Sequence, residues 1–292
     1  MNGAQQLRDY QKRLRPIESK LRRYTGVRHV DVGYRYVDGQ RTDKLAVRLF
    51  VAGPKLARSQ AKAKNLAPKS VAGLPIDVVA LTRARPAPSA LATPEPAGDL
   101  LGGLGIGQTA QSAVTLGVVV HSLAFPGPQI LTSHEVGYEN ETVLQFGLAG
   151  SRSRPVGHVV NWQPSNMCAL VQVDGIPSVY DAVRDLPNVR KVAEPVDISV
   201  LFANRVSLQK YGYGTQRTEA ILDGGEASDG TVALSALVDG HPPVAGPGDC
   251  GSIWMTSDGM AVALHYGSRD SDGAALAQTM HGIRDLLGLS FP

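Results

Sequence analysis

Cysteine, aromatic residues and long apolar runs are all scarce in this chain. Only two of its 292 residues are cysteines, Cys168 and Cys250, and 5% are aromatic. Two cysteines exclude a disulfide scaffold, and their spacing gives no zinc site. Apolar runs of about 18 residues, the length that crosses a bilayer, are missing, so we expect no membrane partner. The first residues lack the apolar core of a secretion signal, which predicts a cytoplasmic location.

Glycine and proline, by contrast, are abundant, with 32 and 19 residues. Apolar residues make up 43% of the chain, which is enough to bury a core. Many turn-forming residues with few aromatics favour short strands over a helical bundle. The length suggests about two domains of ordinary size.

Charge is distributed unevenly along the chain. Residues 1–90 hold 19 Lys and Arg against 6 Asp and Glu, a net charge of +13, while the whole chain carries +3. A basic module is therefore followed by an acidic one. The basic module predicts either a contact with nucleic acid or another acidic partner, or a solvated face that complements the acidic domain of the same molecule. The second interpretation is favoured, because no known nucleic-acid-binding motif is present.

Residues 1–83 predict a small α+β domain. Leu7, Leu14 and Leu21 recur at helical spacing and predict an amphipathic helix over 4–24. Alternation predicts two strands, 28–37 and 44–52, and Asp38-Gly39 between them is typical of a hairpin turn. A short basic helix over 54–66 and a third strand over 76–81 complete this domain.

Residues 84–112 are first proline-rich and then glycine-rich, which predicts a linker before the second domain. The glycines at its end follow no predicted strand, so they do not indicate a dinucleotide site. From residue 113 onward the chain contains about ten short apolar runs separated by turns, which is typical of a barrel or paired barrels. The predicted strands are 115–121, 129–132, 143–146, 157–162, 169–173, 197–202, 218–222, 232–237, 252–255 and 260–266, followed by a helix over 278–287.

The segment 246–252 reads Gly-Pro-Gly-Asp-Cys-Gly-Ser and precedes an apolar segment, 260–267, that contains His265. This Gly-Asp-nucleophile-Gly turn resembles the nucleophile loop of trypsin-like (chymotrypsin-fold) peptidases, with Cys250 where most members carry serine. Other segments of the chain more weakly resemble the bacterial members of this family, which have a small N-terminal domain. The resemblance implies a mostly β, chymotrypsin-like double barrel over 113–292 and a protein or peptide substrate. It also implies an oxyanion hole at the backbone of Gly248, Asp249 and Cys250.

The segment Ile130–Val136 resembles the part of that family that carries the catalytic histidine. When it is aligned on Val136, the family's histidine falls on Glu135, and His134 stands one residue earlier. The family's acid position falls on Cys168. Proton transfer from a thiol to a carboxylate is uphill by about 6 kcal/mol for unperturbed groups, so Glu135 is a poor base. We therefore expect a cysteine endopeptidase with Cys250 as nucleophile and His134 as base. The alternative is a pseudo-peptidase whose degenerate triad binds a peptide without cleaving it.

His265 lies 15 residues after Cys250, on the segment that resembles the strand beside the specificity pocket. Viral chymotrypsin-like cysteine proteases have a histidine at similar spacing that recognises a glutamine or glutamate side chain. This resemblance implies that His265 and Gly267 bind substrate, while a buried structural histidine is the plainer alternative. The remaining histidines show no paired ligand spacing, and we expect no metal and no cofactor.

Overall fold

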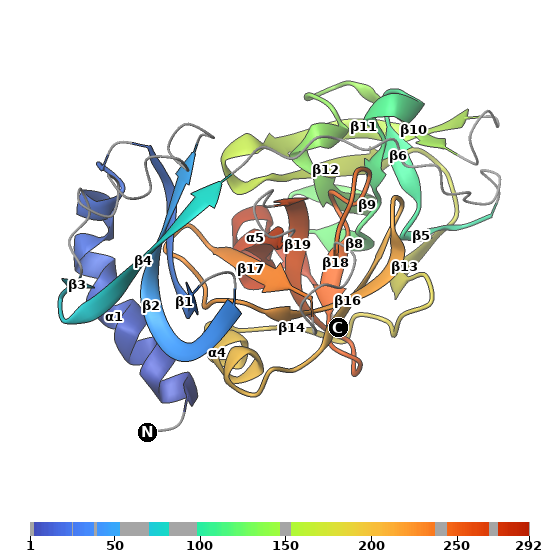
Figure 1. Cartoon of the computed structure of the whole chain (residues 1–292). Coiled ribbons are helices and arrows are strands. Elements are labelled where there is room, and N and C mark those ends of the chain that lie inside the picture. Colours follow the sequence, from blue (N-terminus) through green and yellow to red (C-terminus); the bar gives the residue numbers. More distant parts are fainter. Residues whose placement is uncertain are drawn as a thin grey trace.

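The computed structural model describes residues 3–24, 26–37, 40–52, 70–81, 98–146, 153–236, 244–268 and 274–291. They form a small α+β domain followed by two β-barrels, as Figure 1 shows from blue to red. This is the predicted architecture, a double β-barrel preceded by a small α+β domain. In the described residues no helix is long and apolar enough to span a membrane.

The N-terminal domain packs one helix on a four-stranded sheet. Its elements are α1 (Gly3–Leu21), β1 (Val27–Val37), β2 (Gln40–Ala52), β3 (Ser70–Val71) and β4 (Leu74–Leu81). The sheet order is β1-β2-β4-β3, with β1 and β2 antiparallel and β2 and β4 parallel. Leu7, Leu14 and Leu21 are buried along one face of α1, which confirms the helical pattern. The predicted turn at Asp38-Gly39 and the helix over 54–66 lie outside the described residues.

The first barrel begins earlier than the sequence suggested. Residues 98–112, predicted as linker, contain β5 (Leu100–Gly102), β6 (Gly105–Gly107) and the 3₁₀ turn η1 (Ala110–Ser112). The sheet order is β5-β13-β8-β9-β12-β11-β10-β6-β7. Because β5 and β6 are separated by only two residues, this one segment pairs with both ends of the sheet and closes it. The other elements are β7 (Val114–Thr115), β8 (Val118–Ser122), β9 (Phe125–Ser133), η2 (His134–Val136), β10 (Thr142–Phe146), β11 (Ser153–Gln163), η3 (Pro164–Asn166), β12 (Cys168–Val173) and β13 (Ser178–Val183).

The second barrel closes through pairing of β19 with β20, in the order β19-β18-β15-β16-β17-β20. The strand predicted over 197–202 is wrong, since these residues lie in helix α4 (Pro195–Ala203). Glu194 and Asp197 form a capping box at its start, a signal that outweighs the apolar run. The other elements are β14 (Lys191–Val192), β15 (Leu208–Gly212), β16 (Gln216–Leu222), β17 (Thr231–Ser235), β18 (Ile253–Met255), β19 (Met260–Ser268), β20 (Ala275–Thr279), α5 (Met280–Leu287) and β21 (Leu289–Ser290).

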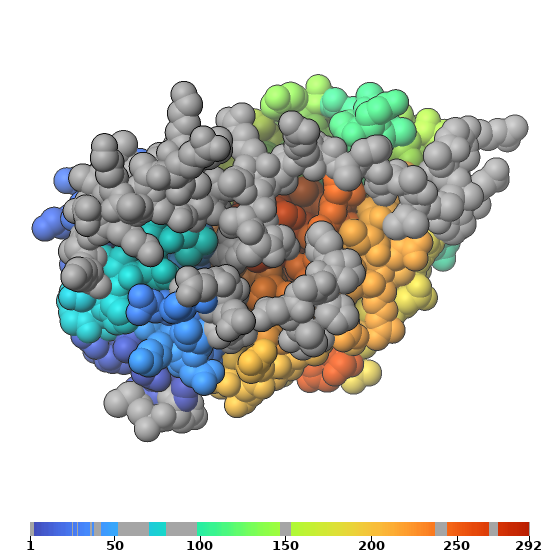
Figure 2. Space-filling model, in the orientation of Figure 1, coloured from blue at the N-terminus to red at the C-terminus, as the bar shows by residue number. Residues whose placement is uncertain are grey.

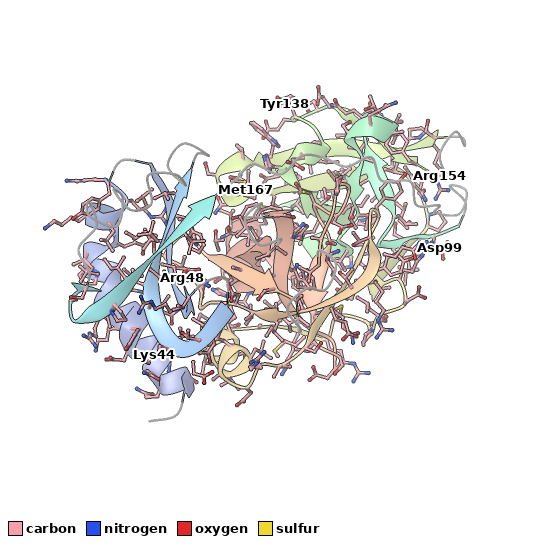
Figure 3. All side chains as sticks on the ribbon, in the orientation of Figure 1. Lys44, Arg48, Asp99, Tyr138, Arg154 and Met167 are labelled. Carbon is pink, nitrogen blue, oxygen red and sulfur yellow. The ribbon has the colours of Figure 1, made fainter. Side chains whose placement is uncertain are left out.

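The N-terminal domain is joined to the second barrel through a shared core. Leu7, Leu49 and Leu222 belong to one buried cluster that spans both units. Arg48, labelled in Figure 3, lies fully buried between them. Its guanidinium donates to both oxygens of Asp31 at 2.7 Å and to Asp223 Oδ2 at 2.6 Å. Figure 2 shows the N-terminal domain in blue on the left, the first barrel in green at the top, and the second barrel in orange and red.

Candidate active site

The turn that carries Cys250 is anchored by the carboxylate of Asp249. This carboxylate is 0% exposed and lies 2.6 Å from the ammonium of Lys210, which is also buried. Asp249 also accepts the backbone N–H groups of Gly214, Thr215 and Gly246 at 2.9–3.0 Å, and the Thr215 hydroxyl at 2.6 Å. Burial opposes ionisation, but the Lys210 charge and these donors hold the pKa of Asp249 below its usual value. The result is a buried ion pair that orients the turn.

Thr115 holds the same turn from the first barrel. Its N–H donates to the Cys250 carbonyl at 2.7 Å, and its hydroxyl donates to the Gly248 carbonyl at 2.7 Å. The Thr115 hydroxyl also accepts the N–H of Tyr213 at 2.9 Å. Sequence reasoning missed this positioning role, because nothing near Thr115 in the chain indicates a contact with a turn more than 130 residues away. The Cys250 turn is therefore fastened to both barrels.

Glycine at position 251 is required by close packing as well as by backbone conformation. Gly251 has φ of +96°, and a Cβ there would lie 2.2 Å from the Thr115 carbonyl oxygen. Gly248 has φ of +88°, also in the region that favours glycine. These two positions let the turn approach the first barrel closely.

Cys250 is a partly exposed residue, and its thiol donates to the carbonyl of Tyr266 at 3.3 Å. The side chain of Glu135 lies close enough to act on the thiol. Burial, the charge of Glu135 and then the charge of Asp249 raise the pKa of this thiol well above its ordinary value. Cys250 is therefore a protonated thiol at neutral pH.

The 3₁₀ turn η2 decides which side chain reaches Cys250. Glu135, which the alignment placed at the histidine position, acts on the thiol, whereas no described interaction joins His134 to it. The His134 carbonyl instead accepts the indole N–H of Trp162 at 3.0 Å. The ring nitrogen Nδ1 of His134 is buried and has no hydrogen-bond partner. The structure thus brings Glu135, and not His134, to the predicted nucleophile.

Cys168, at the family's acid position, begins β12 and pairs with Ser133 in the ladder to β9. It is 0% exposed, and burial raises the pKa of its thiol to about 12. This neutral side chain cannot orient a base by charge. Of the three residues that the strict alignment placed at the family's positions, Glu135 lies beside the Cys250 thiol and Cys168 is buried.

The oxyanion-hole prediction concerned the backbone of Gly248, Asp249 and Cys250. In the described part of the chain the N–H groups of Gly248 and Cys250 donate to no other residue, whereas the Asp249 N–H donates to the Gly246 carbonyl at 3.1 Å. Among the described residues neither N–H donates to a backbone carbonyl, and the Cys250 N–H lies against its own thiol. The N–H of Asp249 is engaged in the turn itself.

His265 is fully buried, and neither ring nitrogen has a hydrogen-bond partner. Burial lowers the pKa of His265 to about 3, and the Lys210 charge acts in the same direction. The imidazole lies edge-on to Trp254, with ring centroids 6.5 Å apart. Gly267 by contrast is partly exposed, and open space lies where its Cβ would be. Contact of His265 with a substrate side chain stays a prediction, and its burial favours the structural alternative.

Acidic, histidine and cysteine side chains do not gather into a metal-ligand set anywhere in the described ranges, where no group of three such residues is found.

The residues around Cys250 offer a thiol, a carboxylate and backbone donors. This combination can bind a polypeptide backbone and a cationic group.

Comparison with known proteins gives a likeness of fold. No protein-family model and no curated protein matches the chain. Among solved structures it is similar to protease A of Thermobifida fusca, at 17% identity and a TM-score of 0.49, over 66% of this chain and 98% of that one. It is similar to a glutamic-acid-specific serine protease at 19% identity and a TM-score of 0.46, over 66% and 100% of the two chains. The chymotrypsin of Cellulomonas bogoriensis is similar at 15% identity and a TM-score of 0.47, over 67% and 99%.

Proposed function

We propose that the site around Cys250 binds an extended polypeptide without efficient hydrolysis, so that the chain acts as a pseudo-peptidase. The observation that carries this proposal is the contact of Glu135 with the Cys250 thiol. A carboxylate at this place keeps the proton on sulfur, whereas a histidine would remove it. Nucleophilic attack requires the thiolate, which this environment disfavours.

The energetic cost of using Glu135 as a base is large. Proton transfer from a thiol to a carboxylate is uphill by about 6 kcal/mol for unperturbed groups. In this site burial and the charge of Asp249 also raise the pKa of the thiol, whereas the charge of Glu135 is neutralised by the transfer itself. A penalty of about 6 kcal/mol slows a reaction by about four orders of magnitude.

The features that recognise a peptide backbone are nevertheless present. The N–H groups of Gly248 and Cys250 are suited to a carbonyl oxygen. Lys210 and Thr115 hold the turn so that these donors keep their direction before a ligand arrives. Open space at Gly267 leaves room beside them. These features support binding whether or not hydrolysis follows.

A cysteine endopeptidase with His134 as base is the second candidate. It is favoured by the backbone donors and by the place of His134 in the same turn as Glu135. The Nδ1 of His134 is buried and has no hydrogen-bond partner among the described residues, so this nitrogen could accept a proton if the turn moved. This candidate requires the turn to shift by one residue, so that His134 replaces Glu135 at the thiol.

The two candidates are separated by measuring binding and cleavage with one polypeptide. Reduced, carboxymethylated casein is incubated with the protein, and the alkylation rate of Cys250 is read by peptide mass spectrometry. We expect casein to slow the alkylation of Cys250 while remaining intact. Cleavage that is lost in both Cys250→Ala and His134→Ala supports the endopeptidase instead. If casein neither protects Cys250 nor is cleaved, both candidate functions are refuted.

A further inference from the structure

An exposed aromatic pair lies beside the Cys250 site. Tyr138 is 63% exposed, and Trp162 on β11 is partly exposed. Their ring centroids are 5.0 Å apart at an interplanar angle of 64°, an edge-to-face arrangement. In Figure 3 Tyr138 projects from the outer edge of the first barrel. The pair therefore presents ring surface to solvent where a bound polypeptide could reach it.

Hydrogen bonds hold both rings in place before any ligand binds. The indole N–H of Trp162 donates to the His134 carbonyl at 3.0 Å, which fixes the ring to the turn that carries Glu135. The backbone N–H of Tyr138 donates to Glu141 Oε2 at 2.6 Å, and the Glu141 N–H donates to the Tyr138 carbonyl at 3.1 Å. Aromatic side chains held in this way contribute contact area at low entropic cost. The pair is continuous with the site of the proposed function.

The charge around the pair selects among the side chains that it could bind. The segment 135–141 contains Glu135, Glu139 and Glu141 and no Lys or Arg. Among the described residues none of these carboxylates lies in an ion pair, although Glu141 accepts from the Gln108 amide and from the Tyr138 N–H. Aromatic faces attract cations, and nearby carboxylates strengthen that preference. A guanidinium can stack on a ring while it donates to a carboxylate, whereas an aliphatic side chain gains only the ring contact.

We propose that Tyr138 and Trp162, with the acidic segment 135–141, bind an arginine or lysine side chain of the polypeptide held at Cys250. This inference rests on the proposed function and specifies the class of its ligand, a basic peptide. The aromatic pair supplies the contact surface, and the carboxylates supply the selectivity for positive charge.

Arginine and citrulline peptides test the charge preference, since their side chains are similar in shape and only arginine is charged. N-acetyl-Ala-Arg-Ala-amide and its citrulline counterpart are titrated while tryptophan fluorescence is recorded. The chain has two tryptophans, and Trp254 is 0% exposed, so a ligand-dependent signal is assigned to Trp162 and should be absent in Trp162→Phe. We expect the arginine peptide to bind about five-fold more tightly, the ratio typical of one exposed cation–π contact.

Variants and salt separate this inference from the proposed function. Tyr138→Ala and Glu139→Gln should each reduce the preference for arginine, and rising salt should reduce it in the parent protein. Equal affinity for the two peptides, with casein still protecting Cys250, would overturn the inference alone. Absence of both peptide binding and casein protection would overturn the proposed function as well.

Discussion

Replacing Glu135 with glutamine should make the Cys250 thiol easier to ionise. The substitution keeps the size of the side chain and removes its charge, which contacts the thiol. A unit charge about 4 Å away changes the energy of a thiolate by about 1 kcal/mol in water and by about 4 kcal/mol near a protein surface. One pKa unit corresponds to about 1.4 kcal/mol, so we expect the thiol pKa to fall by about one to three units. Burial and Asp249 still hold it above the ordinary value.

The assay is the rate of iodoacetamide labelling between pH 6 and 11, with Cys250 read separately from Cys168 by peptide mass spectrometry. Glu139→Gln is the matched control, because it removes an exposed carboxylate from the same segment that does not act on the thiol. A labelling pKa that is the same in Glu135→Gln, Glu139→Gln and the parent would refute the reasoning. It would mean that Glu135 does not face Cys250 in solution.

Glu135→His extends the same argument. An imidazole in this place matches the thiol pKa far better than a carboxylate and favours the thiolate. We expect labelling of Cys250 at neutral pH, and the appearance of casein cleavage that Cys250→Ala abolishes in the same background. Labelling no faster than in the parent would show that the site lacks the geometry of a Cys–His dyad.

Three further predictions concern stability and the turn. Arg48→Met should destabilise the fold by about 3–5 kcal/mol, because it leaves buried carboxylates unpaired, whereas Lys44→Met on the exposed part of the same strand should cost little in urea unfolding. His265 stays neutral when folded, since its pKa is about 3, so the unfolded chain binds its proton first as the pH falls below about 6.5. Stability should therefore fall by about 2 kcal/mol between pH 6.5 and 5, and His265→Gln should flatten that slope; identical slopes would contradict it. Thr115→Val should cost about 1–3 kcal/mol and speed labelling of Cys250, because two hydrogen bonds to its hydroxyl are lost; an unchanged labelling rate would show that this residue does not restrain the turn.

Local patterns in the sequence were sufficient for much of the fold. The spacing of Leu7, Leu14 and Leu21 predicted α1, because one face of a helix repeats every three to four residues. Alternation predicted the hairpin strands, and short apolar runs separated by turns predicted most strands of the barrels. The glycines around Cys250 identified the turn, since few other residues adopt its backbone conformation.

The errors in the prediction arose where local signals were short or competed. The run 197–202 is apolar enough for a strand, but the capping box at Glu194 starts a helix there. Residues 100–107 are rich in glycine and resemble a linker, yet they pair at both ends of the first barrel. Three-residue strands have too little pattern to be recognised before their partners are known.

The sequence by itself determined most types of element, a barrel architecture and the turn around Cys250. Only the tertiary structure decided that Glu135 rather than His134 meets the thiol, because one residue in a 3₁₀ turn changes the direction of a side chain. Only the tertiary structure joined Arg48 to Asp223 and Thr115 to Gly248, since these pairs are more than 130 residues apart. Contacts of this kind depend on how whole sheets pack, and no local periodicity encodes them.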